Sequence, residues 1–405
     1  MIRHKPYWLD RFPKTRRPSY PRLRGRVEAP VVIIGGGLTG AACALSFGAA
    51  GIRTIVLEAD RVGAGATAGA VGLIREDFDA SFVETASAHG LRASRLLWQG
   101  MRRAALDFAA ALRRFQVRCD LAPQDLLLLA RGPAAAKSLR KEYQARRDAG
   151  LDHTWISAAA LTRQAAIDAA GAIRTHAAVF DPFRACAGLA AAASARGAGI
   201  YESSAVERIR MGRKHVEVST RHGVVQAEAV IVATSARLKD LRALRRHFRT
   251  EHSYAVLTEP LPAGVRRELG SRTTAVRTDR TPPQFLRWMT DDRVMFAGAD
   301  QAEIPARQRE KVLVQRTGEL MYELSVLYPP ISGAMPEWSW DFSHDTSVDG
   351  LPCIGVHRNF PRHLFALGHG RHGAATAWLA ARLLLRHFRN EPARGDEFFG
   401  FGRIL

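Results

Sequence analysis

The segment from Val31 to Glu58 constrains the fold of this chain more than any other stretch of its 405 residues. It opens with four apolar, β-branched residues, which is typical of a strand that is buried on both faces of a parallel sheet. Gly35, Gly37 and Gly40 follow at G-x-G-x-x-G spacing. The first glycine allows a tight turn, the second lets the backbone approach a pyrophosphate, and the third lets the next helix pack close to the strand.

The residues after the glycines complete a βαβ unit. A helix is predicted from Thr39 to Ala50, and a second strand from Thr54 to Leu57 ends on Glu58. The helix N-terminus presents free N–H groups to phosphates, and an acid at the end of the second strand can accept hydrogen bonds from a ribose diol. The glycine spacing alone is a weak signal, but strand, glycines, helix, strand and acid in this order predict a bound dinucleotide. FAD and NAD both stay open at this point, since they carry the same ADP half.

Length and composition narrow the class of protein. A chain of 405 residues can form two domains or one large one, and its hydrophobic content of 47% is ordinary for a globular protein. No apolar run reaches the roughly 18 residues that cross a bilayer, so no transmembrane segment is expected. The four cysteines stand far apart without a C-x-x-C pair. This spacing argues against a disulfide scaffold and against a zinc or other metal site, and it fits a reducing cytoplasm.

The net charge of +20 is large for a chain of this length. Such a charge can attract nucleic acid, an anionic membrane surface or acidic substrates. Arginine is abundant throughout the chain, however, and the basic residues neither gather in one tail nor alternate with aromatics in a binding motif. No nucleic-acid partner is therefore expected.

Two further glycine-rich turns are placed to contact a cofactor. The loop from Gly63 to Gly72 exposes backbone that can reach a phosphate or a flavin edge, although a flexible connector would have the same composition. Near the end of the chain, the turn from Gly368 to Gly373 opens an apolar helix predicted from Ala374 to Phe388. That turn repeats the physics of the first motif, because helix N–H groups are again aimed at something electron-rich.

The rest of the chain mixes helices and strands. One long helix is predicted from Phe82 to Phe115, where no proline intervenes. Tyr201 to Ile209 is predicted as a strand, and Ala229 to Thr234 as a later strand of the parallel sheet. Residues 237–345 hold longer mixed strands and a helix without glycine motifs, so they are a candidate substrate domain.

Five features of the chain occur together in one known family. They are the arm with Tyr7 and Trp8, the fingerprint that ends at Glu58, the loop from Gly63 to Gly72, the helix start at Asp181 and Pro182, and the final Asp349-Gly350-Leu351-Pro352 with Gly368-His369-Gly370-Arg371-His372-Gly373. In this combination the chain resembles the FAD-dependent amine and D-amino-acid oxidase (DAO) family, which includes glycine oxidase, sarcosine oxidase and γ-glutamylputrescine oxidase. The arm and the loop are most similar to the γ-glutamylputrescine oxidase branch, and the last turn to the glycine oxidase branch.

The resemblance implies an α/β (α+β) fold. A Rossmann-like FAD/NAD(P)-binding domain would be assembled from several segments, and a substrate domain with an antiparallel sheet would roof the flavin. The implied ranges are an N-terminal arm at 1–28, an FAD-binding domain at 29–80, 170–236 and 346–405, and a substrate or cap domain at 81–169 and 237–345.

The resemblance also implies the residues that contact FAD. The ADP half would be held by Gly35, Gly37, Leu38, Thr39, Gly40, Glu58 and Ala59, and the diphosphate and flavin would be lined by Arg61, Gly65, Ala66 and Thr67. Val206 would meet the adenine through its backbone, and Gly350, Gly370, His372 and Gly373 would lie at the isoalloxazine.

Two positions depart from the family pattern. Glycine oxidase has an arginine five positions before its Asp-Gly pair that grips the substrate carboxylate, and here that position is His344. Sarcosine oxidase has a cysteine just upstream that binds flavin covalently, and here the stretch from Trp340 to His344 contains none. Cys353 lies too far along the chain to replace it, so non-covalent FAD is expected.

The candidate catalytic, substrate-contacting residues are Arg371, His369, Arg287, His344 and Tyr254. Arg371 can bind a carboxylate through two parallel hydrogen bonds, or it can be an exposed residue at a helix start. Arg287 and Tyr254 can equally be ordinary sheet positions, and His369 a structural hydrogen-bonding residue. No triad-like constellation stands out, which fits a reaction whose redox step the cofactor performs.

The resemblance predicts an FAD-dependent oxidoreductase that oxidises the CH–NH bond of a small amine or amino acid to an imine and passes the electrons to oxygen. Amines are favoured over small amino acids, because His344 replaces the expected arginine. One alternative is a dehydrogenase that passes electrons to a quinone or a carrier protein. Another is a non-catalytic or RNA-associated FAD-binding protein.

Overall fold

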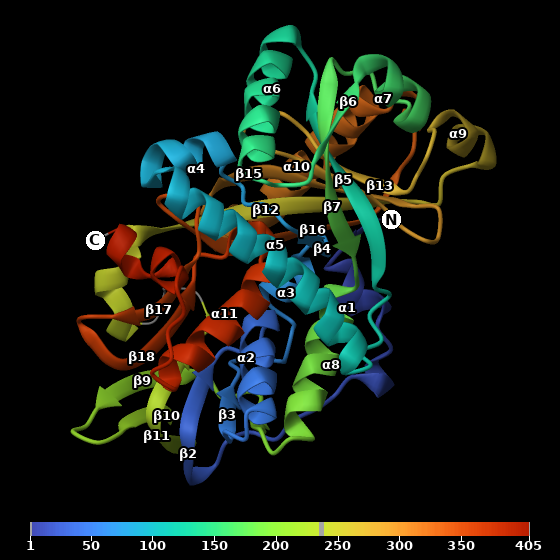
Figure 1. Ribbon diagram of the computed structural model, residues 1–405. Helices are drawn as coiled ribbons and strands as arrows, with labels where there is room; N and C mark the ends of the chain where they lie inside the picture. The colour runs from blue at the N-terminus through green and yellow to red at the C-terminus, as the bar shows by residue number, and fades with distance from the viewer. Residues whose placement is uncertain (1, 235–238, 405) are drawn as a thin grey trace.

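The computed structural model describes residues 2–234 and 239–404, and within them the chain forms two β-sheets with helices around them (Figure 1). An eight-stranded sheet with a parallel centre lies in the lower part of the view. A ten-stranded, mainly antiparallel sheet lies in the upper part. Both sheets collect strands from distant parts of the sequence, so neither is a continuous segment of the chain.

The centre of the eight-stranded sheet is parallel, in the order β18–β11–β2–β3–β8. Ile33 on β2 pairs with Val56 on β3 and with Ile231 on β11. The carboxyl ends of parallel strands lie at one edge, so the turn after β2 and the end of β11 are neighbours. The strands of this sheet are β2 (Gly25–Ile34), β3 (Thr54–Leu57), β8 (Gly199–Tyr201), β9 (Val206–Met211), β10 (Val216–Thr220), β11 (Gly223–Val232), β17 (Cys353–His357) and β18 (Phe360–Leu367).

Alanine-rich helices cover one face of this sheet. Helix α2 (Leu38–Ala49) packs against α8 (Pro182–Ser194) and against α11 (Ala374–Phe388) (Figure 1). Their small side chains let the helix axes approach closely. One buried core, which includes Leu45, joins these helices to the long helix α5 (Leu91–Arg114).

The ten-stranded sheet has two buried faces. On β12 (Phe248–Thr258), Ala255 and Leu257 belong to a cluster with the arm, while Tyr254 and Val256 belong to a cluster with α10 (Arg309–Leu327). Successive side chains of a strand point to opposite faces, which explains this division. The other strands are β1 (Arg3–His4), β4 (Leu73–Arg75), β5 (Ala122–Ala130), β6 (Thr154–Ser157), β7 (Gly171–Val179), β13 (Thr274–Arg277), β14 (Phe285–Trp288), β15 (Val294–Ala302) and β16 (Pro336–Ser347).

The N-terminal arm is tied to the ten-stranded sheet. Strand β1 pairs in parallel with β16, and helix α1 (Tyr7–Arg11) follows it. The Trp8 Nε1–H donates a hydrogen bond of 2.8 Å to the Ala70 carbonyl, just after the short helix α3 (Ala66–Gly69). The arm therefore holds the loop from Gly63 to Gly72 in place.

The remaining helices within the described ranges are peripheral. They are α4 (Phe82–His89), α6 (Pro133–Asp148), α7 (Ala158–Ala165) and α9 (Ala263–Glu268), with the 3₁₀ turns η1 (Lys14–Arg16), η2 (Lys239–His247), η3 (Ala306–Gln308), η4 (Pro329–Ile331), η5 (Gly370–His372), η6 (Asp396–Phe399) and η7 (Phe401–Arg403). No helix of residues 2–234 or 239–404 combines the length and the apolar character that crossing a bilayer requires.

The α/β fold predicted from the sequence is confirmed, with two local differences. The helix predicted from Phe82 to Phe115 is two helices, α4 and α5, because Gly90 takes a φ of +82° and breaks the helix there. The strand predicted from Tyr201 to Ile209 is two strands, β8 and β9, separated by a turn. The segment from Ala229 to Thr234 ends β11 and runs parallel to β2, as predicted.

Strand pairing and helix packing cross the predicted domain ranges at three elements, and the ranges themselves stay a prediction. Strand β4 lies in the range 29–80 predicted for the FAD-binding domain, but it pairs with β7 in the ten-stranded sheet. Strand β7 lies in the range 170–236 predicted for the FAD-binding domain, but it pairs with β5 in the ten-stranded sheet. Helix α5 lies in the range 81–169 predicted for the substrate domain, but it packs against α11. The hydrogen bonds of β7 and the apolar face of α5 determine where these two elements lie, and their place in the sequence does not.

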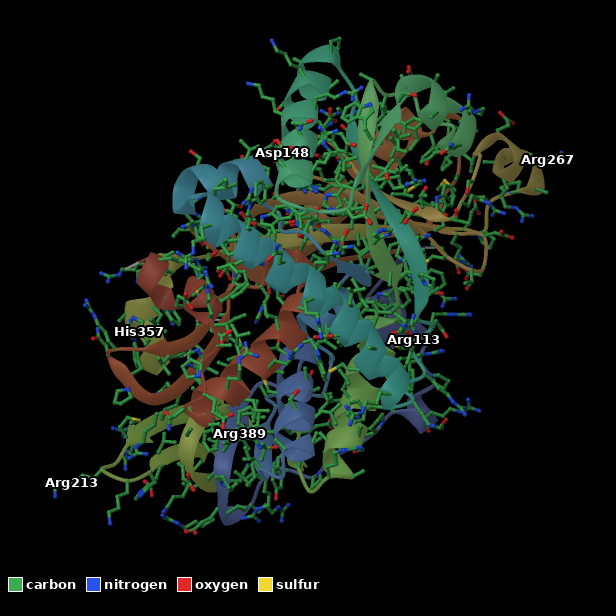
Figure 2. All side chains as sticks on the ribbon, viewed as in Figure 1. Arg113, Asp148, Arg213, Arg267, His357 and Arg389 are labelled. Atoms are coloured by element: carbon green, nitrogen blue, oxygen red, sulfur yellow. The ribbon has the colours of Figure 1, made fainter. Side chains whose placement is uncertain are left out.

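Basic side chains are distributed over the surface. Figure 2 shows Arg113, Arg213, Arg267 and Arg389 on four separate parts of the molecule. They belong to α5, to the turn between β9 and β10, to α9 and to the segment after α11. The charge of +20 is therefore not the property of one element.

Asp181 generates a prediction about stability. Its carboxylate caps α8 by accepting a hydrogen bond of 2.9 Å from the Arg184 N–H. Burial raises the pKa of the Asp181 carboxyl to about 6, above its ordinary value of 3.8. The folded protein therefore loses stability as pH rises from 3.8 to 6 and this carboxyl becomes ionised. We predict that Asp181→Asn increases the free energy of unfolding at pH 7.5 by about 1–3 kcal/mol, because asparagine caps equally well without a buried charge.

Thermal melts at pH 4 and pH 7.5 check this prediction. The gain in Tm should be largest above pH 6, the approximate pKa of Asp181, and should be much smaller near pH 4, where the folded carboxyl is protonated and the unfolded one is only about half ionised. Asp148→Asn, at an exposed carboxylate that ends α6, is the control and should leave Tm nearly unchanged. A lower Tm for the Asp181 variant at pH 7.5 would contradict the prediction.

Candidate cofactor and substrate site

A cavity of about 360 Å³ lies where the carboxyl ends of the parallel strands meet the ten-stranded sheet. The glycine turn after β2, the end of β11 and helix α3 line one side of it. Strand β16 and the turn that leads through η5 into α11 line the other side. The cavity therefore draws its walls from both sheets.

The glycine turn after β2 leaves no room for side chains at two positions. Gly35 has a φ of +109°, and a Cβ there would lie 2.6 Å from the Ala233 carbonyl oxygen. A Cβ at Gly40 would lie 1.8 Å from the Gly35 carbonyl oxygen, so only glycine lets α2 pack this close to β2. Helix α2 consequently begins at the cavity, where Gly37 and Thr39 line the wall.

Two side chains bond this turn to the segments around it. Glu58 accepts hydrogen bonds from the Gly36 N–H at 2.6 Å and from the Asp60 N–H at 2.9 Å. Thr67 Oγ1 accepts a hydrogen bond of 3.0 Å from the N–H of Leu38, the first residue of α2. The loop that contains Thr67 is therefore a bonded wall of the cavity, rather than the flexible connector that the sequence left open.

The second glycine turn forms the opposite wall. Gly368, His369, Gly370 and Arg371 all line the cavity. Both ring nitrogens of His369 are buried, and neither makes a well-formed hydrogen bond to a described residue. Burial lowers the pKa of this imidazole to about 4, so the ring is neutral at physiological pH.

Arg371 begins a chain of polar side chains that crosses the ten-stranded sheet. Its guanidinium forms an ion pair with Asp300 on β15 and donates a hydrogen bond of 2.8 Å to the Pro283 carbonyl. Ser253 Oγ donates a hydrogen bond of 2.8 Å to the Asp300 carboxylate. The same hydroxyl lies 3.5 Å from His344 Nδ1.

Glu251 completes this chain, because its Oε2 lies 3.5 Å from His344 Nε2. The hydrogen bond from His344 lowers the pKa of Glu251. Burial raises the pKa of Asp300, although the Arg371 charge acts in the opposite direction. We call Glu251, Ser253, Asp300, His344 and Arg371 the roof cluster. It holds two carboxylates for one guanidinium.

Most of the predicted FAD-contacting residues line the cavity. These are Gly35, Gly37, Leu38, Thr39, Glu58, Gly65, Ala66, Thr67, Gly370 and Gly373. Gly40, Ala59, Arg61, Val206 and Gly350 lie outside the lining, and the side chain of His372 lies outside the described part of the chain. Arg61 borders two other cavities beside Glu202 instead.

Three of the five candidate catalytic residues line the cavity, namely His344, His369 and Arg371. Tyr254 does not, because it lies on the face of β12 that packs toward α10. There its hydroxyl accepts a hydrogen bond of 2.9 Å from Gln301 Nε2.

Arg287 lies behind the cavity wall. It donates hydrogen bonds of 3.0, 2.8 and 2.8 Å to the carbonyls of Val71, Gly72 and Phe180. Its guanidinium also lies 5.1 Å from the centre of the Trp8 ring. Burial lowers its pKa to about 10, which leaves it charged at neutral pH. Since Gly72 and Phe180 line the cavity, Arg287 fixes two wall segments from outside.

The sequence patterns do not single out Glu251, Ser253 and Asp300. The alternation along β12 is a signal for the first two, because they are polar residues on the face that carries the buried Ala255 and Leu257. Asp300 follows an irregularity in β15, where Gly298 has a φ of +154° and Ala299 a φ of +53°. A bulge re-aims the side chain that follows it, so alternation alone places Asp300 on the wrong face.

The donors and acceptors of the walls suit an FAD molecule. The first turn of α2 offers backbone N–H groups beside Thr39 and Thr67, which is the arrangement that binds a diphosphate. Glu58 directly follows β3, and each of its oxygens can accept a second hydrogen bond, which a ribose would donate. Across the cavity, Gly370 and Phe342 provide backbone and an aromatic surface for a ring system.

Gly40 generates a prediction about cofactor retention. We predict that Gly40→Ala lowers the flavin content of the purified protein about tenfold or more, because the new Cβ would overlap the Gly35 carbonyl oxygen. The visible flavin absorbance per mole of protein measures this content. Gly318→Ala in α10 is the control, since its Cβ would meet no atom within 4 Å. Wild-type flavin content in the Gly40 variant would contradict the prediction.

His369 generates a prediction about pH. Its folded pKa of about 4 lies below the ordinary 6.5, so the unfolded chain binds the proton more tightly between these values. Stability is therefore lost as pH falls through this window. We predict that His369→Gln removes on the order of 2–3 kcal/mol of this loss between pH 6.5 and 4. Urea unfolding at several pH values measures it, with exposed His176→Gln as control. Identical pH slopes for wild type and His369→Gln would contradict it.

Comparison with known proteins agrees with this geometry. The sequence matches the DAO family, described as FAD dependent oxidoreductase, over residues 30–386. It is 25% identical over 383 residues to γ-glutamylputrescine oxidoreductase of Escherichia coli, which covers 94% of this chain and 88% of the relative. It is 27% identical over 363 residues to glycine oxidase of Geobacillus kaustophilus, which covers 87% of this chain and 91% of the relative.

The fold is similar to the crystal structure of glycine oxidase from Geobacillus kaustophilus. The TM-score is 0.76 at 22% sequence identity, and the match covers 93% of this chain and 99% of the other. The resemblance drawn from the five sequence features is thereby confirmed. Since the family match extends from the first buried strand to the helix that closes the cavity, the chain belongs to the DAO family of FAD-dependent oxidoreductases.

Proposed function

We propose that this protein holds FAD without a covalent bond and oxidises the CH–NH bond of an amine or amino acid to an imine, with oxygen as electron acceptor. The observation that carries the proposal is a cavity that joins the glycine turn after β2 to His344 and Arg371 of the roof cluster. The same space thus offers backbone donors for a dinucleotide and polar side chains for a substrate.

The residues of this chain position the reactants. FAD, when bound, supplies the site that accepts a hydride from the carbon beside the amine. The first turn of α2 and Thr67 would hold its diphosphate, and Glu58 its ribose. On the substrate side, Glu251 lies beside His344 but outside the cavity lining, and its lowered pKa keeps a negative charge near the site at neutral pH, which would attract an ammonium group. The two sheets enclose the reacting groups between them.

Amines are the favoured substrates within this proposal. The position that carries the carboxylate-gripping arginine in glycine oxidase is His344 here. The two nitrogens of its ring lie 3.5 Å from Ser253 Oγ and 3.5 Å from Glu251 Oε2. A ring held by a hydroxyl and a carboxylate lacks the paired donors with which an arginine recognises a carboxylate.

The cysteines support non-covalent binding of FAD. Cys353, whose position is nearest to the departure noted in the sequence, is buried on β17 with its Sγ 3.5 Å from Arg403 Nη2. It does not line the cavity. Burial raises the pKa of its thiol to about 11. A thiol that stays protonated at neutral pH is a poor nucleophile.

A dehydrogenase that passes electrons to a quinone or an acidic carrier protein is the second candidate, and the charge of +20 favours it. The arginines in Figure 2 stand on separate parts of the surface, which favours neither a single docking face nor an RNA track. The experiment below therefore also measures which electron acceptor reoxidises the flavin.

The experiment measures reduction and reoxidation of the bound flavin separately. We predict that the purified protein is yellow, that an amine from a panel bleaches it without air, and that air restores the colour. The panel contains monoamines, diamines, N-methyl amino acids and amino acids. Bleaching followed by recovery only with an artificial dye would establish the dehydrogenase. A fully FAD-loaded protein that no member of the panel bleaches would reject the proposal.

Acid precipitation of the same protein tests the linkage to FAD. We expect all of the yellow colour in the supernatant, because no cysteine is placed to bond the ring. A yellow pellet after washing would reject non-covalent binding. It would not bear on amine oxidation, which the bleaching experiment tests separately.

A further inference from the structure

We infer that Asp300 is an internal carboxylate that occupies Arg371 and thereby excludes substrates with a carboxylate beside the reacting carbon. The inference rests on the proposed function, because it places the substrate in the cavity that Arg371 lines. It assigns a specificity role to a residue on β15 that does not itself line the cavity.

Arg371 has the chemistry of a carboxylate-binding residue, but both of its Nη atoms already face acceptors, and only its buried Nε–H lacks a hydrogen-bond partner among the described residues. The guanidinium is paired with Asp300, and its Nη1 donates to the Pro283 carbonyl at 2.8 Å. The Arg371 side chain is 8% exposed and that of Asp300 is 3% exposed. A substrate carboxylate could bind only by displacing Asp300, which would leave a buried carboxylate without its partner, and that is strongly unfavourable.

The backbone directs Asp300 at Arg371. The residues just before it, Gly298 and Ala299, both have positive φ values, and the pairing of β15 with β12 changes register at this point. Ser253 on β12 then holds Asp300 Oδ1 with a hydrogen bond of 2.8 Å, while Oδ2 faces the guanidinium. Two strands therefore fix the carboxylate independently.

An aromatic ring limits the other side of the guanidinium. The Arg371 Cζ lies 5.8 Å from the centre of the Phe285 ring, and the Arg75 Cζ lies 4.9 Å from the same ring. Arg75 is itself buried and paired with Asp77. Arg371 is thus packed among fixed groups, and swinging it toward a new partner would require this packing to open.

The remaining charge of the roof cluster acts in the same direction. Glu251 adds a second carboxylate at the far end of the cluster, and the hydrogen bond from His344 keeps its pKa low. An anionic group beside Arg371 would meet the negative charge of Asp300 and Glu251, whereas an ammonium group would be attracted. The substrate class that fits is an amine whose reacting carbon carries no carboxylate.

A metal ion is a competing explanation for the same side chains, since ligand atoms of Glu251, Asp300 and His344 lie within 4.8 Å of one another. Both oxygens of Asp300 are already engaged, one by Ser253 and one by Arg371. The guanidinium is the cation at this position, so the contacts describe a closed ion pair rather than a metal centre.

The experiment uses the FAD-loaded protein and acetate as the probe for carboxylate binding. Isothermal titration calorimetry and the visible flavin spectrum follow acetate binding to wild type, Asp300→Asn and the double variant Asp300→Asn/Arg371→Met. We expect weak acetate binding to wild type, and its Kd is the reference for the variants. We expect Asp300→Asn to bind acetate about 10- to 100-fold more tightly, as charge-assisted hydrogen bonds to a freed guanidinium predict, and the double variant to lose that gain.

Asp292→Asn is the matched control. Asp292 is also shared by arginines, Arg266 and Arg272, but it lies in the turn between β14 and β15 and not at the cavity. The same loss of one carboxylate should leave acetate binding at the wild-type level. A gain in this control equal to that of Asp300→Asn would show a general effect of net charge and would overturn the inference.

Two results at the cluster itself would also overturn it. They are acetate binding to wild type as tight as to Asp300→Asn, and a folded, yellow Asp300→Asn that gains no acetate binding. If Asp300→Asn does not fold, the Ser253→Ala variant tests the inference instead. This substitution removes one hydrogen bond to Asp300 and keeps the charges of Asp300 and Arg371. That variant should bind acetate about threefold or more tightly than wild type, as the loss of one hydrogen bond predicts, and no gain would reject the inference.

These outcomes are separable from failure of the proposed function. Acetate binding needs a bound flavin but no turnover, so a yellow protein that oxidises no amine rejects the proposed function and still reports on Asp300. If amines are oxidised, Asp300→Asn should shift the ratio of kcat/KM toward the amino acid in a matched pair such as propylamine and 2-aminobutyrate. An unchanged ratio together with a gain in acetate binding would show that Asp300 occupies Arg371 but does not set the substrate class. That result would overturn the specificity role inferred here.

Discussion

The close contact between α2 and β2 is the constraint on which the rest of the structure depends. With hydrogen as the only side chain at Gly40, the helix start lies directly against the Gly35 carbonyl. That contact fixes where the helix N-terminus meets the edge of the parallel sheet. Thr67 then bonds α3 to the same N-terminus, and the end of β11 packs against Gly35. The ten-stranded sheet closes the space that these elements leave.

The parallel sheet and the side of the cavity that the glycine turn after β2 forms could be predicted from the sequence, because the residues that determine them are close together in the chain. Strand, glycines, helix and Glu58 interact within one short segment, so their spacing alone carries the geometry. The substrate wall depends on contacts between distant strands. Tyr254 faces away from the cavity because of strand alternation, and Arg287 bonds three carbonyls from two other segments. Asp300 reaches Arg371 only through an irregular strand, which no periodic pattern in the sequence reveals.

Part of the basic composition serves the interior. Arg287 donates to backbone carbonyls of the cavity wall, Arg371 to the Pro283 carbonyl, and Arg403 to the Leu351 and Gly400 carbonyls at 2.6 and 3.0 Å. Carbonyls at strand ends and turns lack ladder partners, and a buried carbonyl without a donor is unfavourable. A guanidinium can satisfy several of them at once. The abundance of arginine is thus in part an architectural feature of the fold.

The arm places the first residues of the chain beside one of the last strands. His4 Nδ1 lies 2.8 Å from the Ser339 hydroxyl, and the two residues are 335 positions apart. Trp8 meanwhile supports the wall of the cavity through the Ala70 carbonyl. Domains generally fold from the N-terminus during synthesis, but this arm must wait on the ribosome until β16 has emerged. The wall that it supports is therefore completed only after β16 has been made.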